Sequence, residues 1–147
     1  MFHLNGKTFH PVTESHSQTG NCSKLTLIDC TVSGNSANSG GGINNNVATL
    51  TVTNSTISGN TANSTSAGIL NDSGNATLSN CLISGNKATS VYGGGVTNLG
   101  LTTMTNCTVT GNSSLWWGGG IYNMNSSTAE LTLKAFAGKS NAGICSH

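Results

Sequence analysis

Apolar and polar residues alternate along this chain in short runs that return at a fixed interval. In one copy, Leu25 and Leu27 alternate with polar residues, and Cys30 and Val32 resume the alternation after a change of phase at Asp29. Strict alternation is typical of strands, and a change of phase marks a bend. The glycine that follows each run recurs at intervals of 25, 26 and 26 residues, at Gly34, Gly59, Gly85 and Gly111. The pattern therefore predicts repeated units of short strands.

The repeat length predicts how these strands are arranged. Three short strands and their turns fill about 25 residues, and the abundant Thr, Val, Ile, Asn and Gly are poor helix formers. Stacked units pair their open backbone edges at about 4.8 Å. We expect an all-β fold, a right-handed parallel β-helix (a solenoid) of four to five coils of 25–26 residues. The coils should span residues 25–133, between an irregular leader or improvised cap (1–24) and an irregular tail (134–147).

Stacking in register predicts columns of equivalent residues. Asn suits such columns because it tolerates left-handed backbone angles and its amide both donates and accepts hydrogen bonds. The expected aliphatic columns are Leu27, Val52, Leu78, Met104; Val32, Ile57, Ile83, Val109; and Ile43, Ile69, Val96, Ile121. The expected Asn columns are Asp29, Asn54, Asn80, Asn106; Asn35, Asn60, Asn86, Asn112; and Asn45, Asn71, Asn98, Asn123.

The composition narrows the possible partners. Charged residues make up 6% of the chain and the net charge is +1, so there is no basic stripe of the kind that binds nucleic acid. No apolar run approaches the roughly 18 residues of a membrane span. Residues 1–20 lack the apolar segment of a signal peptide. We therefore expect neither a nucleic-acid partner nor a membrane-spanning segment.

The repeats resemble those of a known group. Asn54-Ser55-Thr56-Ile57-Ser58-Gly59-Asn60 and the steps such as Gly94-Gly95-Val96 are similar to the repeats of bacterial polymorphic outer-membrane proteins. The resemblance covers Leu25 to about Leu133, but the Phe that commonly opens the second motif of that group is missing. It implies a fragment of a secreted or cell-surface passenger with a structural or adhesive role and an unknown surface ligand.

Catalytic residues are scarce. Many β-helices act on polysaccharides, and glycoside hydrolysis usually needs two carboxylates about 5–10 Å apart. Asp29 and Asp72 are better explained as turn residues, and the four acidic residues fall in different columns: Glu14, Asp29, Asp72 and Glu130. We predict a protein that is not an enzyme and needs no cofactor; a degenerate polysaccharide-acting enzyme is the minor alternative.

Cysteine and histidine suggest no metal centre. Cys30, Cys81 and Cys107 share one position of the repeat with Ser55, which favours small buried residues. A Cys81–Cys107 disulfide is conceivable by distance, but parallel side chains make its geometry poor. Two further cysteines and all the histidines lie outside the repeats: Cys22, Cys145, His3, His10, His16 and His147.

The best candidates for ligand contact are aromatic. Trp116 and Trp117 lie in the fourth coil, Tyr92 stands at the matching turn of the third, and Tyr122 follows nearby. Such residues could stack on a sugar or contact a protein, or they could shield an end of the solenoid. Glycan binding is thus the main alternative function. Rows of outward Thr leave ice binding as a minor alternative, and uncapped ends would favour end-to-end self-association.

Overall fold

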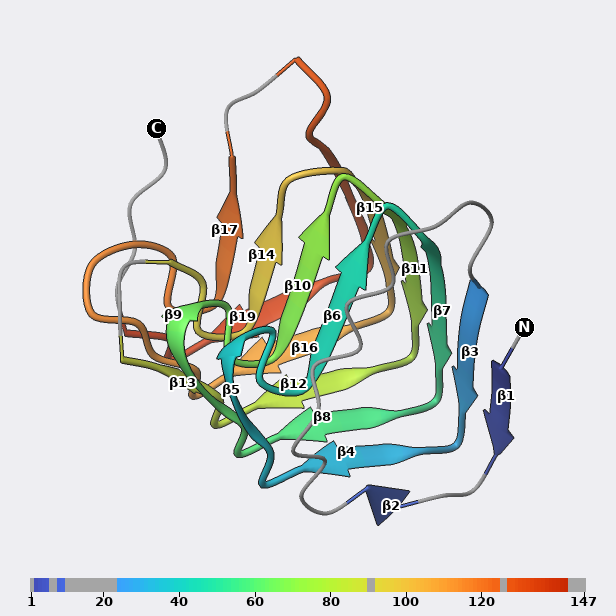
Figure 1. The fold of residues 1–147 in the computed structure, drawn as a ribbon, viewed down its shortest axis with the longest axis horizontal. Coiled ribbons are helices and arrows are strands. Elements are labelled where there is room, and N and C mark those ends of the chain that lie inside the picture. Colours follow the sequence, from blue (N-terminus) through green and yellow to red (C-terminus); the bar gives the residue numbers. More distant parts are fainter. Residues whose placement is uncertain (1, 6–7, 10–23, 90–91, 125–126, 143–147) are drawn as a thin grey trace.

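The computed structural model describes residues 2–5, 8–9, 24–89, 92–124 and 127–142. These residues form an all-β, right-handed parallel solenoid of about four turns, with no helix in any of the described ranges (Figure 1). The predicted fold class is confirmed.

The strands stack into four parallel sheets, which we name A to D. Sheet A contains β1 (Phe2–Asn5), β3 (Lys24–Ile28), β7 (Thr49–Thr53), β11 (Asn75–Ser79), β15 (Leu101–Thr105) and β18 (Glu130–Lys134). Sheet B contains β2 (Thr8–Phe9), β4 (Thr31–Ser33), β8 (Thr56–Ser58), β12 (Leu82–Ser84), β16 (Thr108–Thr110) and β19 (Ala137–Lys139). Sheet C contains β5 (Ser36–Ser39), β9 (Thr61–Thr65) and β13 (Lys87–Ala88), and sheet D contains β6 (Ile43–Asn46), β10 (Ile69–Asp72), β14 (Val96–Asn98) and β17 (Ile121–Asn123).

The strand register places the aliphatic residues in the expected columns. Leu27 pairs with Val52, Val52 with Leu78, and Leu78 with Met104, and all four are at most 3% exposed. The expected column that begins at Val32 in sheet B and the one that begins at Ile43 in sheet D are also paired in register from strand to strand. The core is therefore a continuous apolar interior along the solenoid axis.

One column contains an unexpected polar residue. In sheet A, Leu50 and Ala76 are followed in register by Thr102, which is 2% exposed. Its hydroxyl donates to Asn98 Oδ1 at 2.7 Å and accepts from Asn71 Nδ2 at 3.0 Å. Because both partners belong to an Asn column, Thr102 is buried with its hydrogen bonds satisfied.

The bend from sheet A to sheet B uses the left-handed backbone region. Asp29, Asn54, Asn80 and Asn106 have φ values of 53°, 50°, 55° and 51°, and Ala135 continues the column at 46°. The exposed amides also form a ladder, since Asn106 donates to Asn80 at 2.7 Å and Asn80 to Asn54 at 3.0 Å. This column matches the expectation, and Ala135 is its strained end because alanine disfavours this region.

A second Asn ladder lies inside the solenoid at the corner between sheets B and C. Asn60 Nδ2 donates to Asn86 Oδ1 at 2.9 Å, and the Asn60 backbone amide donates to the same oxygen at 3.0 Å. Asn60 Nδ2 also donates to the Val32 carbonyl of the preceding coil, at 3.1 Å. The pattern repeats with separations of 2.9–3.1 Å along Asn35, Asn60, Asn86, Asn112 and Asn141. We call this column the interior ladder.

The third Asn column closes the turn from sheet D to sheet A. Asn45, Asn71 and Asn98 each donate from Nδ2 to Oδ1 of the next residue, at 2.7, 3.0 and 2.8 Å, ending on Asn123. All three expected Asn columns therefore exist. The column at Asn54 is exposed, and the other two are buried except at their last members.

Strand pairing extends beyond the expected 25–133 range on both sides. β1 and β2 pair in register with β3 and β4, and β19 pairs with β16. Gly138 stands where Val109 would predict an apolar residue, and Phe136 packs against the core beside it. A shifted aromatic residue thus replaces the missing aliphatic one, which is why the repeat was not recognisable there. Residues 10–23 and 143–147 of the expected leader and tail lie outside the described ranges.

Asn86→Ala should strongly destabilise the fold. The change leaves the buried Asn60 amide without its acceptor and the Ile57 carbonyl without its Asn86 donor, at about 1–3 kcal/mol for each unsatisfied group. We expect the free energy of unfolding, measured by urea denaturation, to fall by at least about 2 kcal/mol. Asn63→Ala, at an exposed strand position, is the control and should change it by less than about 0.5 kcal/mol. Equal effects would contradict the importance of the interior ladder.

Ala135→Asn should stabilise the last coil by about 0.5–1 kcal/mol, because Asn tolerates the left-handed angles that Ala135 adopts. The measurement is hydrogen exchange of the β18 and β19 amides, which should slow. Ala137→Asn, at an exposed position of β19 for which no positive φ is found, serves as the control. Unchanged exchange in Ala135→Asn would show that backbone strain does not limit the stability of this end.

Candidate functional site

The predicted aromatic residues lie where each coil passes from sheet C to sheet D. This corner uses positive φ in every coil, at Gly40 (61°), Ser66 (34°), Gly93 (48°) and Gly118 (56°). A Cβ on Gly118 would lie 2.6 Å from the Ile121 carbonyl oxygen, and one on Gly93 would overlap the Thr97 hydroxyl. Glycine therefore permits a close approach between the corner and the outer side of sheet D.

Three of the four predicted aromatic residues are brought together here. Tyr92 forms an isolated parallel bridge with Trp117, and Tyr122 on β17 stands in register with Thr97. The ring centroids of Tyr92 and Tyr122 are 4.9 Å apart, and those of Trp117 and Tyr122 are 6.5 Å apart in an edge-on arrangement. We call Tyr92, Trp117 and Tyr122 the aromatic corner.

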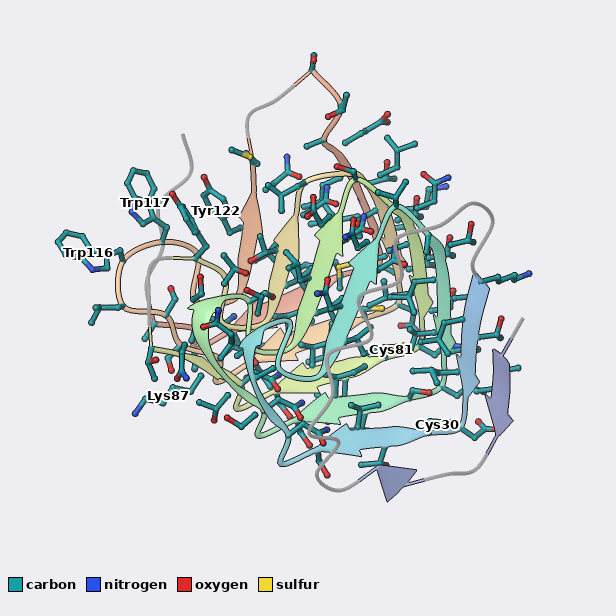
Figure 2. All side chains as sticks on the ribbon, viewed as in Figure 1. Cys30, Cys81, Lys87, Trp116, Trp117 and Tyr122 are labelled. Atoms are coloured by element: carbon teal, nitrogen blue, oxygen red, sulfur yellow. The ribbon has the colours of Figure 1, made fainter. Side chains whose placement is uncertain are left out.

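Trp116 lies beside the aromatic corner but faces away from it. In Figure 2, Trp117 is close to Tyr122, whereas Trp116 points outward from the same loop. Trp116 is 65% exposed and its neighbour Leu115 is 68% exposed. The Ser114 hydroxyl donates to the Trp117 carbonyl at 2.6 Å and so braces the loop. The site thus combines a packed aromatic base with one freely presented indole ring.

Sequence reasoning missed the residues beneath the aromatic corner. These residues are Asn44, Leu70 and Thr97, which form one outward column of sheet D with Tyr122, yet Leu70 is 6% and Thr97 2% exposed. Within the described part of the chain, Thr97 Oγ1 and Asn44 Oδ1 are buried without a hydrogen-bond partner. The sequence signal was the glycine that follows both Tyr92 and Trp117, because it marks the turn that folds back over this column.

The acidic residues considered for catalysis occupy separate places. Asp29 is at the bend between sheets A and B with positive φ, as a turn residue, and Asp72 ends β10. Glu130 begins β18, and Glu14 lies outside the described ranges. Where the structure is described, it contains no group of three or more His, Cys, Asp or Glu residues that could hold a metal ion, and no helix that could cross a membrane.

The cysteine column lies inside the bend between sheets A and B. Cys30, Cys81 and Cys107 are unoxidised and at most 3% exposed, and Ser55 continues the column with 3% exposure. A hydrogen bond from the Cys81 thiol to the Cys107 sulfur raises the pKa of Cys81 and lowers that of Cys107 to about 7. Cys22 and Cys145 lie outside the described residues.

Comparison with known families now identifies the fold family. A family model described as the right handed beta helix region matches residues 3–136. The chain belongs to this β-helix family. No curated protein and no solved structure matches it. The β-helix match includes strands of all four sheets; it begins within β1, before the expected 25–133 range, and ends before β19. The resemblance to polymorphic outer-membrane repeats stays a prediction.

The two tryptophans should differ in their effect on stability. Trp117→Ala removes the edge-on contact with Tyr122 and should lower the free energy of unfolding by about 1 kcal/mol. Trp116→Ala alters a largely exposed ring and should change it by less than about 0.5 kcal/mol. Thermal unfolding of both variants measures the difference. A larger loss for Trp116→Ala would show that the loop packs differently.

Proposed function

We propose that the chain is a non-catalytic structural segment whose coils support surface contacts. The observation that carries this proposal is the interior ladder. Its buried amides connect five successive coil positions, from Asn35 to Asn141, and each amide is engaged in holding neighbouring coils together. Polar groups that are satisfied by the scaffold itself serve rigidity rather than chemistry.

The proposed setting is a secreted or cell-surface protein with an adhesive role. The resemblance of the repeats to bacterial surface passengers supports this setting. The outward hydroxyl row of sheet A also suits such a surface, since it joins Thr51, Thr77, Thr103 and Thr132 without a charged residue. A regular row of hydroxyl groups provides a spacer along which contact loops can be displayed.

Absence of catalysis is testable on pectin-like polymers. We expect no formation of new reducing ends, because the described carboxylates do not share one column. Chain cleavage that disappears in Asp29→Asn or Asp72→Asn would contradict the proposal. Cleavage that persists in both variants would indicate a contaminating enzyme, and removal of that activity by further purification should restore the expected result.

Glycan binding is the second candidate, and the exposure of Trp116 is the observation that favours it. An indole ring that is 65% exposed beside a packed aromatic base offers a flat apolar face, onto which a pyranose ring can stack. Phenol groups of Tyr92 and Tyr122 add hydrogen-bonding capacity at its edge.

A glycan array with variants of one loop tests this candidate. Trp116→Ala should lower the signal for any bound glycan by about five- to thirtyfold, since stacking of this kind contributes roughly 1–2 kcal/mol. Leu115→Ala is the matched control because Leu115 is equally exposed in the same loop but lacks a flat ring. Binding that survives Trp116→Ala would exclude this ring as the contact, and equal losses in both variants would indicate nonspecific apolar adhesion.

A further inference from the structure

Cys81 and Cys107 occupy the same position on adjacent coils. Ser79 pairs with Thr105 before them and Leu82 pairs with Thr108 after them, so the two cysteines stack in register. They are 3% and 1% exposed and belong to the apolar core. Each thiol also donates to a backbone carbonyl of its own coil, Cys81 to Ser79 at 3.2 Å and Cys107 to Thr105 at 3.3 Å.

The spacing of stacked strands decides which bond can join the two sulfurs. Adjacent coils are about 4.8 Å apart, and side chains in register keep nearly that separation. A disulfide needs Cβ atoms about 3.8 Å apart and an S–S bond of about 2.05 Å, so it would require the coils to approach. Two metal–thiolate bonds of about 2.3 Å placed end to end span about 4.6 Å. Two thiolates in register on adjacent coils therefore stand at nearly the separation that one bound ion needs.

We propose that Cys81 and Cys107 form a buried two-coordinate site for a soft monovalent metal ion, Cu(I) in particular. Thiolate ligands favour Cu(I), whereas a structural Zn²⁺ needs four ligands and Ca²⁺ or Mg²⁺ needs several oxygens. The surrounding core is apolar apart from Ser55 in the same column, and the site offers two sulfurs. A site with only two ligands, both of them soft, therefore favours Cu(I) over these divalent ions.

The binding step is an exchange of protons for the metal. Two S–Cu bonds form, both thiols release their protons to water, and copper remains Cu(I), so no electron is transferred. The product carries one negative charge. The Cys81 backbone amide, which hydrogen-bonds to the Cys107 sulfur, stabilises that charge. The same geometry recurs lower in the column, where the Cys30 amide donates to Ser55 Oγ at 3.0 Å.

The chain contains its own control pair. Cys30 and Ser55 occupy the corresponding positions two coils earlier, with equal burial, but one sulfur is replaced by oxygen. Ser55 also demonstrates that serine is accommodated in this column, so Cys→Ser variants should fold. If two thiols stacked in register are sufficient to bind Cu(I), Ser55→Cys should create further copper-binding capacity. This substitution places a thiol between Cys30 and Cys81.

The experiment measures Cu(I) binding by the full chain under anaerobic conditions. Cys22→Ser and Cys145→Ser are introduced first to remove the two thiols outside the coils. Cu(I) is delivered from a coloured chelator, and competition gives the affinity and the number of ions per chain. Thermal unfolding supplies a second readout, since free Cu(I) at about 100 times the Kd should raise the folding equilibrium constant about 100-fold.

We expect one Cu(I) per chain, lost in Cys81→Ser and in Cys107→Ser but kept in Cys30→Ser. Ser55→Cys should bind additional Cu(I). Binding that survives either Cys81→Ser or Cys107→Ser, or that disappears in Cys30→Ser, would overturn the proposal. So would weak binding with no effect on thermal unfolding, because an ion held between two coils must stabilise their stacking.

Discussion

The fold depends on the hydrogen bonds that asparagine amides make from one coil to the next. A coil of about 25 residues has few large apolar side chains, and its open edges must be paired in a fixed register. In the interior ladder, each Asn Oδ1 accepts from the side-chain and backbone amides of the preceding coil, at 2.9–3.1 Å. A shift of one residue would break every one of these bonds. The ladder therefore specifies the register as well as adding stability.

The other features of the coil follow once that register is set. Aliphatic residues recur above one another and exclude water from the axis, so a small side chain such as Cys107 suffices at the bend between sheets A and B. The exposed ladder at Asn54, Asn80 and Asn106 fixes the left-handed bend between two sheets. Because each coil repeats its neighbour, the same hydrogen bonds and packing contacts recur along the whole solenoid.

Most of the fold could be predicted because the same residue types return at a constant spacing. The columns at Leu27, Val32 and Asn35 needed only alternation and periodicity, and register confirms them. Thr102 could not be foreseen as a buried residue, since its burial depends on amides from Asn71 and Asn98 that meet it only in three dimensions. The grouping of Tyr92 with Tyr122 likewise depends on a fold-back at glycine, whose direction the sequence does not encode locally.

The interior ladder predicts slow hydrogen exchange of its asparagine side-chain amides. Side-chain amides that are 0–1% exposed and bonded between coils exchange hydrogen only when the coils separate. Hydrogen exchange of the Asn60 and Asn86 Nδ2 protons, followed by NMR, is the most direct measurement of this. We predict protection comparable to that of the slowest backbone amides of β8 and β12. Exchange at the rate of an exposed asparagine such as Asn63 would contradict the account.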